Sequence, residues 1–351
     1  MAKIKKTKRP TIRDVSEAAG VSLGTTSRVI NRSGPVSEKA VLAVNAAVKK
    51  LNYNPNSVAQ SLRLKRTNVV GCLIPDIANP VFSILAKALE KQLKKHGFTL
   101  LLASSDMDLA TELQILELFR RRKVDGIILS ISDESAPELK HALEQIEVPI
   151  VALDRSLPVE ADAVLYDHST AICTTVNYLF QLGHQRVAMI TGNEQIAPTR
   201  ERIAGYKKAF IDSGLTVDPK LIRAGGITAE HGFAEASALL ALPIPPTAII
   251  AGANQILVGV LRAINRAQLR IPRDISVVCC DDTPLTELMV PPVTVVHRDI
   301  PEWGRLTADM LLARLRHVNE KSEMDAEPAR TLRMSCQLIV RGSCATAPLK
   351  D

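Results

Sequence analysis

The sequence has few aromatic residues and no long apolar run. Phe, Trp and Tyr together make up 3% of its 351 residues. No segment reaches the roughly 18 uninterrupted apolar residues that a bilayer span needs, so a membrane protein is not expected. The basic N-terminus, MAKIKKTKRP, is followed by no apolar segment, and we therefore expect no secretory leader and a cytoplasmic location. Because 46% of the residues are apolar, the chain can still bury sizeable cores, and its length predicts two or three domains.

The six cysteines and seven histidines lack the spacing of a metal or catalytic site. No Cys-x-x-Cys pair occurs, and Cys279 and Cys280 stand inside the apolar run ISVVCC, so buried thiols are expected rather than disulfides or zinc ligands. The glycine-rich nucleotide loops, Gly-x-Ser-x-Gly and His-Glu-x-x-His are all missing. We therefore predict no catalytic residue, no metal and no cofactor, and we interpret His184 as a hydrogen-bonded structural residue.

Charge is distributed unevenly along the chain. Residues 1–67 hold 14 Lys and Arg against 3 acids, a net charge of +11, whereas the remainder carries 30 basic and 34 acidic residues. A cationic segment of this kind favours binding to a polyanion such as DNA, because counterions are released from the phosphates. A solvated basic tail is the alternative that charge alone leaves open.

Three short helical patterns occupy the basic segment. Thr11 can cap a first helix that stops at Gly20, Ser22 can cap a second that ends near Asn31, and Ser37 opens a third. The first two helices are joined by the tight turn Gly-Val-Ser, which is typical of a helix-turn-helix. The second helix would then project from the first and could enter a major groove about 12 Å wide.

A break and a short helical pattern follow the third helix. LNYNPNS (51–57) contains the Asn and Pro residues of a loop, and VAQSLRLK (58–65) is compatible with a helix. Isolated helices of this length are marginal in water. We therefore interpret 56–64 as a hinge that folds only when it is docked.

From residue 69 onward, apolar strands alternate with amphipathic helices. Strands are predicted at 69–74, 98–103, 126–131, 149–154, 186–192, 248–252 and 275–281. Uninterrupted Val, Ile and Leu runs between helices indicate parallel strands that are buried on both faces. Asp76, Asp154, Gly192 and Asp281 lie at or just after strand ends, where ligands bind in open α/β sheets.

Several segments in order along the chain resemble one family. TIRDVSEAAGVSLGTTSRVIN (11–31) resembles the headpiece of the LacI–GalR regulators, and NYNPNSVAQSLR (52–63) resembles their hinge. VVGCLIPDIANPVF, VDGIILS, VPIVALDR, RERIAGY, RIPRDISVVCCDD and PPVTVVHRD then follow in family order, so the resemblance covers about residues 10–342. It implies an α/β protein with an N-terminal helix-turn-helix headpiece, a hinge helix and a two-subdomain core of parallel sheets flanked by helices, similar to periplasmic binding proteins.

The resemblance also implies domain boundaries and an oligomeric state. The headpiece is expected at 10–55, the hinge at 56–67 and the core at 68–342. The first subdomain would comprise about 68–167 and 299–326, and the second about 168–298 and 327–342. A regulator of this kind binds a pseudo-palindromic operator in double-stranded DNA as a homodimer. The stripe Phe82, Leu85 and Leu89 is either part of the partner face or simply core, and the tail SCATAPLKD lacks the heptads of a coiled coil.

The family pattern places a base-reading residue at Arg28, on the second helix. Arg28 would bind guanine O6 and N7, with a solvated surface arginine as the alternative. Leu23 could contact a thymine methyl group, whereas Gly24 has no side chain to reach a base. Leu62, apolar among polar neighbours, suits a wedge in the minor groove. The full predicted DNA-binding set is Thr11, Ser22, Leu23, Gly24, Thr25, Ser27, Arg28, Asn31, Ala59, Leu62 and Arg63.

The same resemblance places an effector between the two core halves. Asp154, Arg202, Asp281 and Arg298 match effector-binding positions, with ordinary ion pairs as the alternative. Ile227 stands where relatives often have a stacking Trp or Phe, and Ala253-Asn254 replaces a frequent Asn-Asp or Gly-Asp pair, which removes an acceptor charge. Several arginines and fewer acids favour an acidic effector among sugars, sugar acids and sugar phosphates. The full predicted set is Asp76, Phe82, Ser130, Ser132, Asp154, Arg200, Arg202, Ile227, Asn254, Asp281 and Arg298.

Two other functions fit parts of the sequence. An enzyme would need the catalytic motifs that are missing here. A solute-binding protein of a transporter would share the core, but it would carry a secretory leader and no cationic headpiece. We therefore predict a transcriptional regulator, and we interpret it as a repressor. The sequence does not specify whether the effector releases the operator or promotes its binding.

Overall fold

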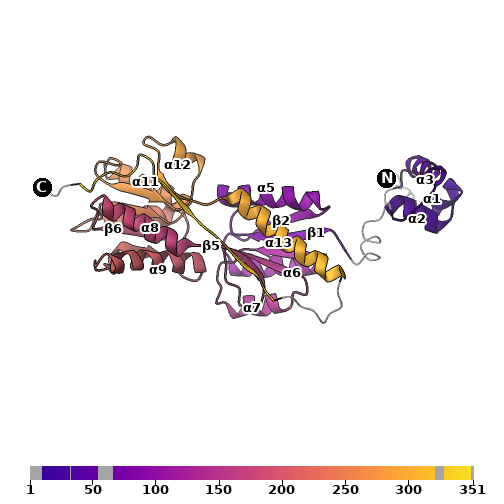
Figure 1. The fold of residues 1–351 in the computed structure, drawn as a ribbon, viewed down its shortest axis with the longest axis horizontal. Helices are drawn as coiled ribbons and strands as arrows, with labels where there is room; N and C mark the ends of the chain where they lie inside the picture. Colours follow the sequence, from indigo (N-terminus) through magenta and orange to yellow (C-terminus); the bar gives the residue numbers. More distant parts are fainter. Residues whose placement is uncertain (1–9, 32, 54–65, 321–327, 349–351) are drawn as a thin grey trace, which may run out of the picture. The chain divides into compact units, whose positions relative to one another are not determined.

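A computed structural model describes residues 10–31, 33–53, 66–320 and 328–348 of the protein (Figure 1). Its internal contacts divide the chain into two compact units, Met1–Thr67 and Asn68–Asp351. The first unit is the headpiece and the second is the core. Most of the predicted hinge, including Ala59, Leu62 and Arg63, lies outside the described residues.

The headpiece contains the three predicted helices, α1 (Ile12–Ala19), α2 (Leu23–Asn31) and α3 (Glu38–Lys50). At the start of α1, the Thr11 amide donates to Asp14 Oδ2 at 2.6 Å and the Asp14 amide donates to Thr11 Oγ1 at 3.4 Å. This reciprocal pair confirms that Thr11 caps the first helix, because it satisfies two amides that the helix itself leaves unbonded.

The predicted turn and inward-facing residues of the headpiece are also present. Gly20 ends α1 with φ +63°, a left-handed conformation that glycine adopts without a Cβ clash. Ser22 Oγ accepts from the Thr25 amide at 3.1 Å and so begins α2. Thr26 and Val44 are fully buried between the helices. Apolar residues of all three helices meet in this small core, which holds α2 in a fixed orientation.

The first subdomain of the core is built on a parallel sheet that, in the described residues, has six strands in the order β11-β5-β4-β3-β1-β2. The strands are β1 (Val69–Ile74), β2 (Thr99–Ser104), β3 (Gly126–Leu129), β4 (Ile150–Leu153), β5 (Asp162–Tyr166) and β11 (Thr331–Met334). Helices α5 (Pro80–Lys95) and α13 (Ile300–Glu320) cover one face, and α6 (Leu109–Arg122) and α7 (Pro137–Glu144) cover the other. Both faces are therefore buried, as the apolar strands predicted.

The second subdomain repeats this three-layer arrangement, with six strands among the described residues in the order β12-β10-β9-β8-β6-β7. The strands are β6 (Val187–Thr191), β7 (Ile222–Ala224), β8 (Ala248–Ala251), β9 (Ser276–Cys279), β10 (Thr294–His297) and β12 (Gln337–Ile339). Helices α8 (His168–Gln181) and α9 (Ala197–Asp212) cover one face, and α10 (Ala229–Leu240) and α11 (Asn254–Arg266) cover the other. A short helix, α12 (Pro284–Leu288), follows β9, and β12 pairs antiparallel with β10.

All seven predicted strands are confirmed, with ends that shift by one or two residues. Five strands were missed, namely β5, β7, β10, β11 and β12. They are short, and β11 and β12 lie at sheet edges with mostly exposed or half-buried residues. Edge strands of this kind lack the continuous apolar run that marks a buried parallel strand.

One predicted subdomain boundary is wrong. The sequence predicts that the segment from about 327 onward belongs to the second subdomain. In the structure, β11 pairs parallel with β5 in the first sheet, and the chain joins the second sheet only at β12. The last crossing between subdomains therefore lies between Met334 and Gln337.

The position of α9 matters for the site because this helix carries Arg202. A Cβ atom at Gly205 would lie 2.1 Å from the Ser169 carbonyl oxygen, so glycine is required where α9 packs on α8. The buried His184 bonds Thr247 Oγ1 at 2.9 Å and Ser276 Oγ at 3.0 Å, which confirms its structural role. These contacts fix the helices of the second subdomain against its sheet.

Three further sequence predictions concern the core. Leu85 and Leu89 of α5 are fully buried against the first sheet, so these two residues are core and not a partner face. The six cysteines are free, and Cys279 and Cys280 are buried. None of the helices in the described ranges combines the length and apolar character needed to cross a membrane.

Candidate functional site

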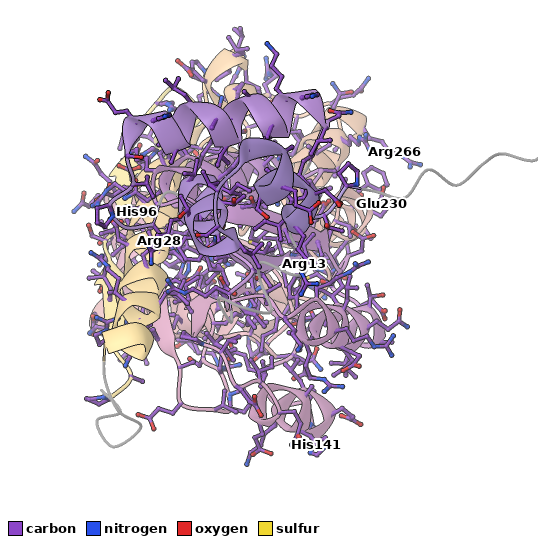
Figure 2. The ribbon with its side chains drawn as sticks, turned by 90° about the vertical axis from the view of Figure 1, so that its right-hand side faces the viewer. Arg13, Arg28, His96, His141, Glu230 and Arg266 are labelled. Carbon is purple, nitrogen blue, oxygen red and sulfur yellow. The ribbon has the colours of Figure 1, made fainter. Side chains whose placement is uncertain are left out.

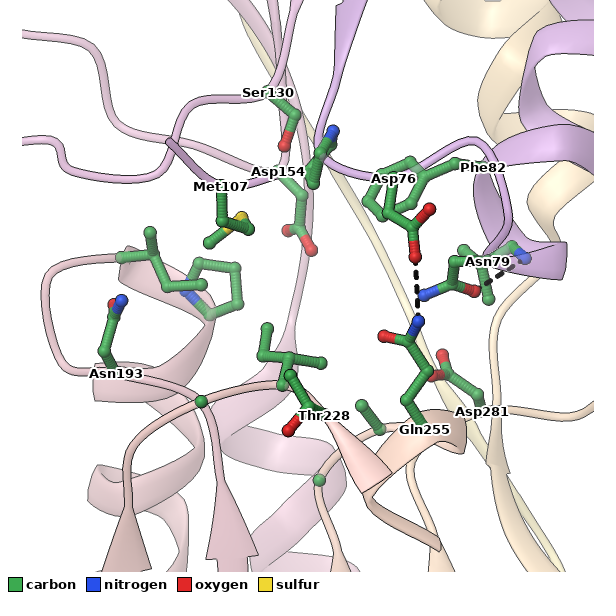
Figure 3. Close-up of a pocket in the computed structure, with 18 of the residues that line it drawn as sticks. Asp76, Asn79, Phe82, Met107, Ser130, Asp154, Asn193, Thr228, Gln255 and Asp281 are labelled. Carbon is green, nitrogen blue, oxygen red and sulfur yellow. Dashed lines mark hydrogen bonds between the residues drawn. The ribbon is translucent and has the colours of Figure 1, made fainter. Parts of the chain in front are cut away.

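A pocket of about 410 Å³ lies between the two subdomains, at the carboxyl ends of their strands (Figure 3). Asp76 and Asp154 follow β1 and β4 of the first sheet, and Asp281 follows β9 of the second. Parallel strands bring their carboxyl ends to one edge, so residues distant in sequence converge there. The prediction that strand-end acids meet at a cleft is borne out by this geometry.

Arg298 connects the two sides of the pocket. Its Nη1 atom lies 3.6 Å from Asp154 Oδ2, and its Nη2 donates to Asp281 Oδ1 at 2.5 Å. All three side chains are buried, and the guanidinium lies 5.2 Å from the centre of the Tyr166 ring. One cation is therefore held by two carboxylates in a site that water hardly reaches, where charge–charge interactions are strong.

His168 lies behind the pocket, where it contacts the lining residue Asp154, and the sequence gives no sign of this contact. Its Nε2 lies 2.8 Å from Asp154 Oδ2, and both side chains are buried. Burial lowers the pKa of His168, against the attraction of the Asp154 carboxylate, which acts to raise it. Burial would raise the pKa of Asp154, but His168, Arg298 and Arg155 together hold it well below its ordinary value.

The pocket contains one arginine that forms no ion pair with any residue that the structure describes. Arg202, on α9, is 7% exposed, and it makes no hydrogen bond or ion pair with the residues that the structure describes. Its Nε atom is buried without a partner, as are the Ser130 hydroxyl and Asn193 Oδ1 in the same pocket. Buried polar groups without partners are costly, so these atoms are suited to a ligand that carries oxygens.

Three predicted effector residues lie outside the pocket lining. Ser132 is buried but donates to Glu112 Oε2 at 3.1 Å. Arg200 Nη2 donates to Glu134 Oε2 at 2.5 Å, and Arg200 does not line the pocket that Arg202 lines. Asn254 uses its Nδ2 to bond Asn79 Oδ1 at 3.0 Å. Each of these side chains is occupied by a protein partner, which a reading of motifs cannot detect.

The remaining predicted residues do line the pocket, together with several that were missed. Phe82, Ser130 and Ile227 are present as predicted. Gln255 was missed, and its Nε2 donates to Asp76 Oδ2 at 2.8 Å, a bond between the two subdomains that Figure 3 shows as a dashed line. The other missed lining residues include Asn79 at the start of α5, Met107, Asn193 and Thr228 in loops, and Trp303 in α13.

The charge argument for an acidic effector is not supported by the pocket. Its lining contains four acids and three arginines, not an excess of arginine. Arg155 is bonded to the Ile131 and Asp154 carbonyl oxygens, at 2.6 and 2.8 Å. Arg298 is held by its two carboxylates. Within the described lining, Arg202 alone remains to meet a ligand with its charge.

The headpiece presents one face of α2 to solvent. Leu23 is 44% exposed, and Gly24 and Arg28 are also exposed, whereas Thr26 and Val29 are buried on the opposite face. Arg28 can be followed on the headpiece in Figure 2. Gly24 and Arg28 are one helical turn apart, so the exposed face continues along α2.

The smaller polar residues of the predicted DNA-binding set are held by local hydrogen bonds. Ser22 Oγ and Thr25 Oγ1 are 2.9 Å apart. Asn31 Nδ2 donates to the Ser27 carbonyl oxygen at 2.8 Å. Together with Thr11 they lie at the ends or along the surface of α1 and α2, where side chains of this kind contact phosphates.

Comparison with known proteins identifies both parts of the chain. Residues 11–56 match the family model of bacterial regulatory proteins, lacI family, and residues 176–344 match a periplasmic binding protein-like domain. The ribose operon repressor of Escherichia coli K12 is 34% identical over 307 residues, which cover 87% of this chain and 93% of that protein.

Known structures agree with this assignment. The lac repressor dimer bound to operator and the anti-inducer ONPF has a TM-score of 0.82 at 28% identity, covering 96% of this chain and all of that one. A LacI family regulator from Enterococcus faecium with bound ribose has a TM-score of 0.68 at 27% identity, over 80% of this chain and all of that one. The predicted fold and the predicted role in DNA-binding transcription regulation are thereby confirmed. The chain belongs to the lacI family of bacterial regulatory proteins.

Proposed function

We propose that this protein is a cytoplasmic repressor whose homodimer binds a pseudo-palindromic operator and changes its operator affinity when a small sugar-type effector occupies the core pocket. The observation that carries the proposal is Arg202, a buried cation without a protein partner, in a pocket lined by both subdomains. A ligand that bonds Arg202 and the opposite subdomain together would favour one relative position of the two halves. Such differential binding is what an allosteric effector requires.

The pocket chemistry suits a monosaccharide. The lining combines carboxylates, amides and the unpaired Arg202 guanidinium with the apolar side chains of Phe82, Met107 and Ile227. Sugar hydroxyls both donate and accept hydrogen bonds, so they can satisfy Asp281 and Arg202 at once. Relatives support this class, since one is a ribose operon repressor and a structural neighbour holds ribose. Because carboxylates balance the arginines, we place neutral sugars before sugar acids and sugar phosphates.

The effector class is tested by ligand-dependent stability and operator binding. Thermal-shift measurements on the full chain would screen neutral sugars, sugar acids and sugar phosphates. Any compound that raises Tm would then be added to a fluorescence anisotropy titration with operator DNA selected from a random library. A compound of one class that shifts both Tm and operator affinity supports the proposal. If no compound of the three classes shifts either quantity, a sugar-type effector is excluded.

Arg202→Ala is expected to keep operator binding and to lose the effector response. The substitution removes a side chain that bonds no described residue, so its cost in stability is small. Loss of a charge-assisted hydrogen bond to the effector should weaken effector binding by about 1.5–3 kcal/mol, or roughly 10- to 150-fold. Calorimetry with the identified effector, and operator titrations with and without it, measure both quantities.

Asp281→Ala serves as a comparison for Arg202→Ala. Asp281 also accepts the Asn254 amide at 3.0 Å and pairs with Arg298, so its loss should reduce stability as well as the effector response. A full effector response in both variants would place the effector site elsewhere.

Leu62→Ala is expected to weaken specific operator binding and to reduce DNA bending, while effector binding survives. The prediction rests on the sequence, where Leu62 stands among polar residues in the hinge, and an apolar wedge in the minor groove opens it to further contacts. Gel shifts with circularly permuted operator fragments report affinity and bend angle together. An unchanged affinity and bend angle would exclude intercalation by this residue.

A further inference from the structure

Helix α9 begins without a cap from its own subdomain. Its first residue is Ala197, and Ile196 stands at the capping position with no side chain to accept a backbone amide. The first amides of a helix have no partner within the helix and are normally satisfied by such a side chain. In α9 the acceptor comes instead from the other subdomain.

That acceptor is Glu134, in the loop that follows β3 of the first sheet. Its Oε1 accepts the Ala197 amide at 3.0 Å and the Ser156 amide at 3.0 Å, while its Oε2 accepts Arg200 Nη2 at 2.5 Å. The carboxylate side chain is 6% exposed. Both oxygens are therefore used, and the partners lie on both sides of the boundary between the subdomains.

Neighbouring residues strengthen this junction. The Glu134 amide donates to the Gln195 carbonyl oxygen at 3.2 Å, and Gln195 Nε2 donates to Asp133 Oδ2 at 2.9 Å. Away from this junction, Gln255 of the pocket lining bonds Asp76 across the same boundary. Hydrogen bonds therefore join the two subdomains both at Glu134 and at the pocket itself.

An ordinary surface ion pair is the alternative for Glu134 and Arg200. Exposed pairs contribute little, and the Arg200 side chain is 47% exposed. Glu134, however, is buried and accepts two backbone amides, so its role does not depend on Arg200 alone. A carboxylate near the first turn of a helix also interacts favourably with the helix dipole.

We propose that Glu134 is a positioning residue that caps α9 across the cleft, stabilises the closed arrangement of the core, and thereby sets the position of Arg202 one turn further along the same helix. Opening the cleft removes the carboxylate and leaves the start of α9 without a cap. The closed arrangement is consequently favoured before an effector binds, which raises the fraction of molecules competent to bind it. The consequence for Arg202 rests on the proposed effector function, whereas the capping and closure do not.

Hydrogen exchange tests the cap without any ligand. In the full-length protein, exchange of the segment 194–203 would be followed by mass spectrometry for Glu134→Ala, Glu134→Gln and Arg200→Ala. Loss of the cap should raise exchange at the start of α9 by about tenfold in Glu134→Ala. Glu134→Gln, which keeps one acceptor oxygen, should retain more protection. The matched control is Asp212→Ala, which removes the 2.8 Å Lys208–Asp212 ion pair at the other end of α9 and should leave exchange at 194–203 unchanged.

The fluorescence of Trp303 provides a second measurement, which reports whether the cleft between the subdomains is closed. Trp303 is the single tryptophan of the chain, it lines the pocket, and it is 1% exposed. Acrylamide quenching of its fluorescence should increase severalfold in Glu134→Ala and less in Arg200→Ala, and remain at the wild-type value in Asp212→Ala. If Glu134→Ala does not fold, the same comparison is made with Glu134→Gln and Arg200→Ala.

The outcomes separate this proposal from the effector hypothesis. Faster exchange at α9 together with greater quenching supports it, whether or not any sugar binds. Wild-type exchange and quenching in both Glu134 variants would overturn it, even if the effector screen succeeds. A rise that Asp212→Ala reproduces would also overturn it, because the effect would then be a general loosening of α9.

Discussion

Replacing Arg298 by alanine is expected to destabilise the core by about 3–5 kcal/mol and to abolish the effector response. The substitution leaves Asp154 and Asp281 buried without their shared cation. Removing one partner of a buried ion pair costs more than the pair itself contributes, because the remaining charge stays desolvated. Here two carboxylates are left, and both line the pocket, so stability and ligand binding are lost together.

The loss of stability should depend on pH in a defined direction. In the wild-type protein the pKa of Asp154 lies below its ordinary value, so this group stabilises the fold above its unfolded pKa, and the contribution is lost as the pH falls through the folded pKa. Without Arg298 the pKa of Asp154 rises, since an attractive charge has been removed and burial remains. The difference between variant and wild type should therefore be largest near pH 7 and should decrease toward pH 4.

Urea unfolding of the full chain at pH 4 to 8 measures this difference. Arg298→Lys is the matched control, since it keeps the positive charge but not the guanidinium that contacts both Asp154 and Asp281. We expect the lysine variant to lie between alanine and wild type in stability. If Arg298→Ala were as stable as wild type at pH 7, the prediction would be wrong, because the charges of the two carboxylates would then be stabilised by water and not by Arg298.

The fold was largely predictable because its main signals are local. The strands in the centre of each sheet are continuous apolar runs, and continuous burial on both faces is what a parallel sheet between helix layers requires. The edge strand β11 has no such run, and its membership of the first sheet depends on pairing with β5, where paired residues such as Thr331 and Ala163 are 168 positions apart. The misplaced boundary near 327 follows from that missing signal.

The pocket lining was predictable where a residue matches a family motif. Asp154 follows β4 and Arg298 follows β10, whereas Arg202 lies inside α9, and all three line the same pocket. The partners of these residues were not predictable. His168 bonds Asp154 only because the chain crosses between subdomains at that point, and Arg200 lies two residues from Arg202 yet bonds Glu134 outside the pocket lining. A sequence motif therefore predicts which residues line the pocket, whereas the hydrogen-bond partner of each residue depends on tertiary packing.

The second large effect is expected at the operator, from Arg28→Ala. Arg28 lies on the exposed face of α2, and the buried Thr26 and Val29 fix the opposite face against the headpiece core. The substitution should therefore leave the headpiece folded. A bidentate contact to guanine contributes about 1–3 kcal/mol of discrimination per half-site, so a dimer with two half-sites should lose about 2–6 kcal/mol.

The size of this loss should depend on the DNA sequence, which distinguishes base reading from phosphate binding. Gly24, one turn before Arg28, has no side chain to take over its contact, so little compensation is expected within α2. Leu23 can contribute only apolar contact to a thymine methyl group. Discrimination by α2 should accordingly be concentrated at one guanine in each half-site.

Anisotropy titrations against the selected operator and against random DNA, at several salt concentrations, decide between these roles. If Arg28 reads a base, Arg28→Ala loses affinity for operator far more than for random DNA, and replacing the guanine abolishes the difference between variant and wild type. Arg28→Lys keeps the positive charge and the salt dependence but loses the planar guanidinium that makes two hydrogen bonds to guanine. It should therefore bind random DNA as the wild type does and recover only part of the discrimination between operator and random DNA. Lys49→Ala, in the last turn of α3, controls for the loss of one positive charge. Equal losses on operator and random DNA in Arg28→Ala would instead identify Arg28 as a phosphate contact, because that interaction carries no sequence information.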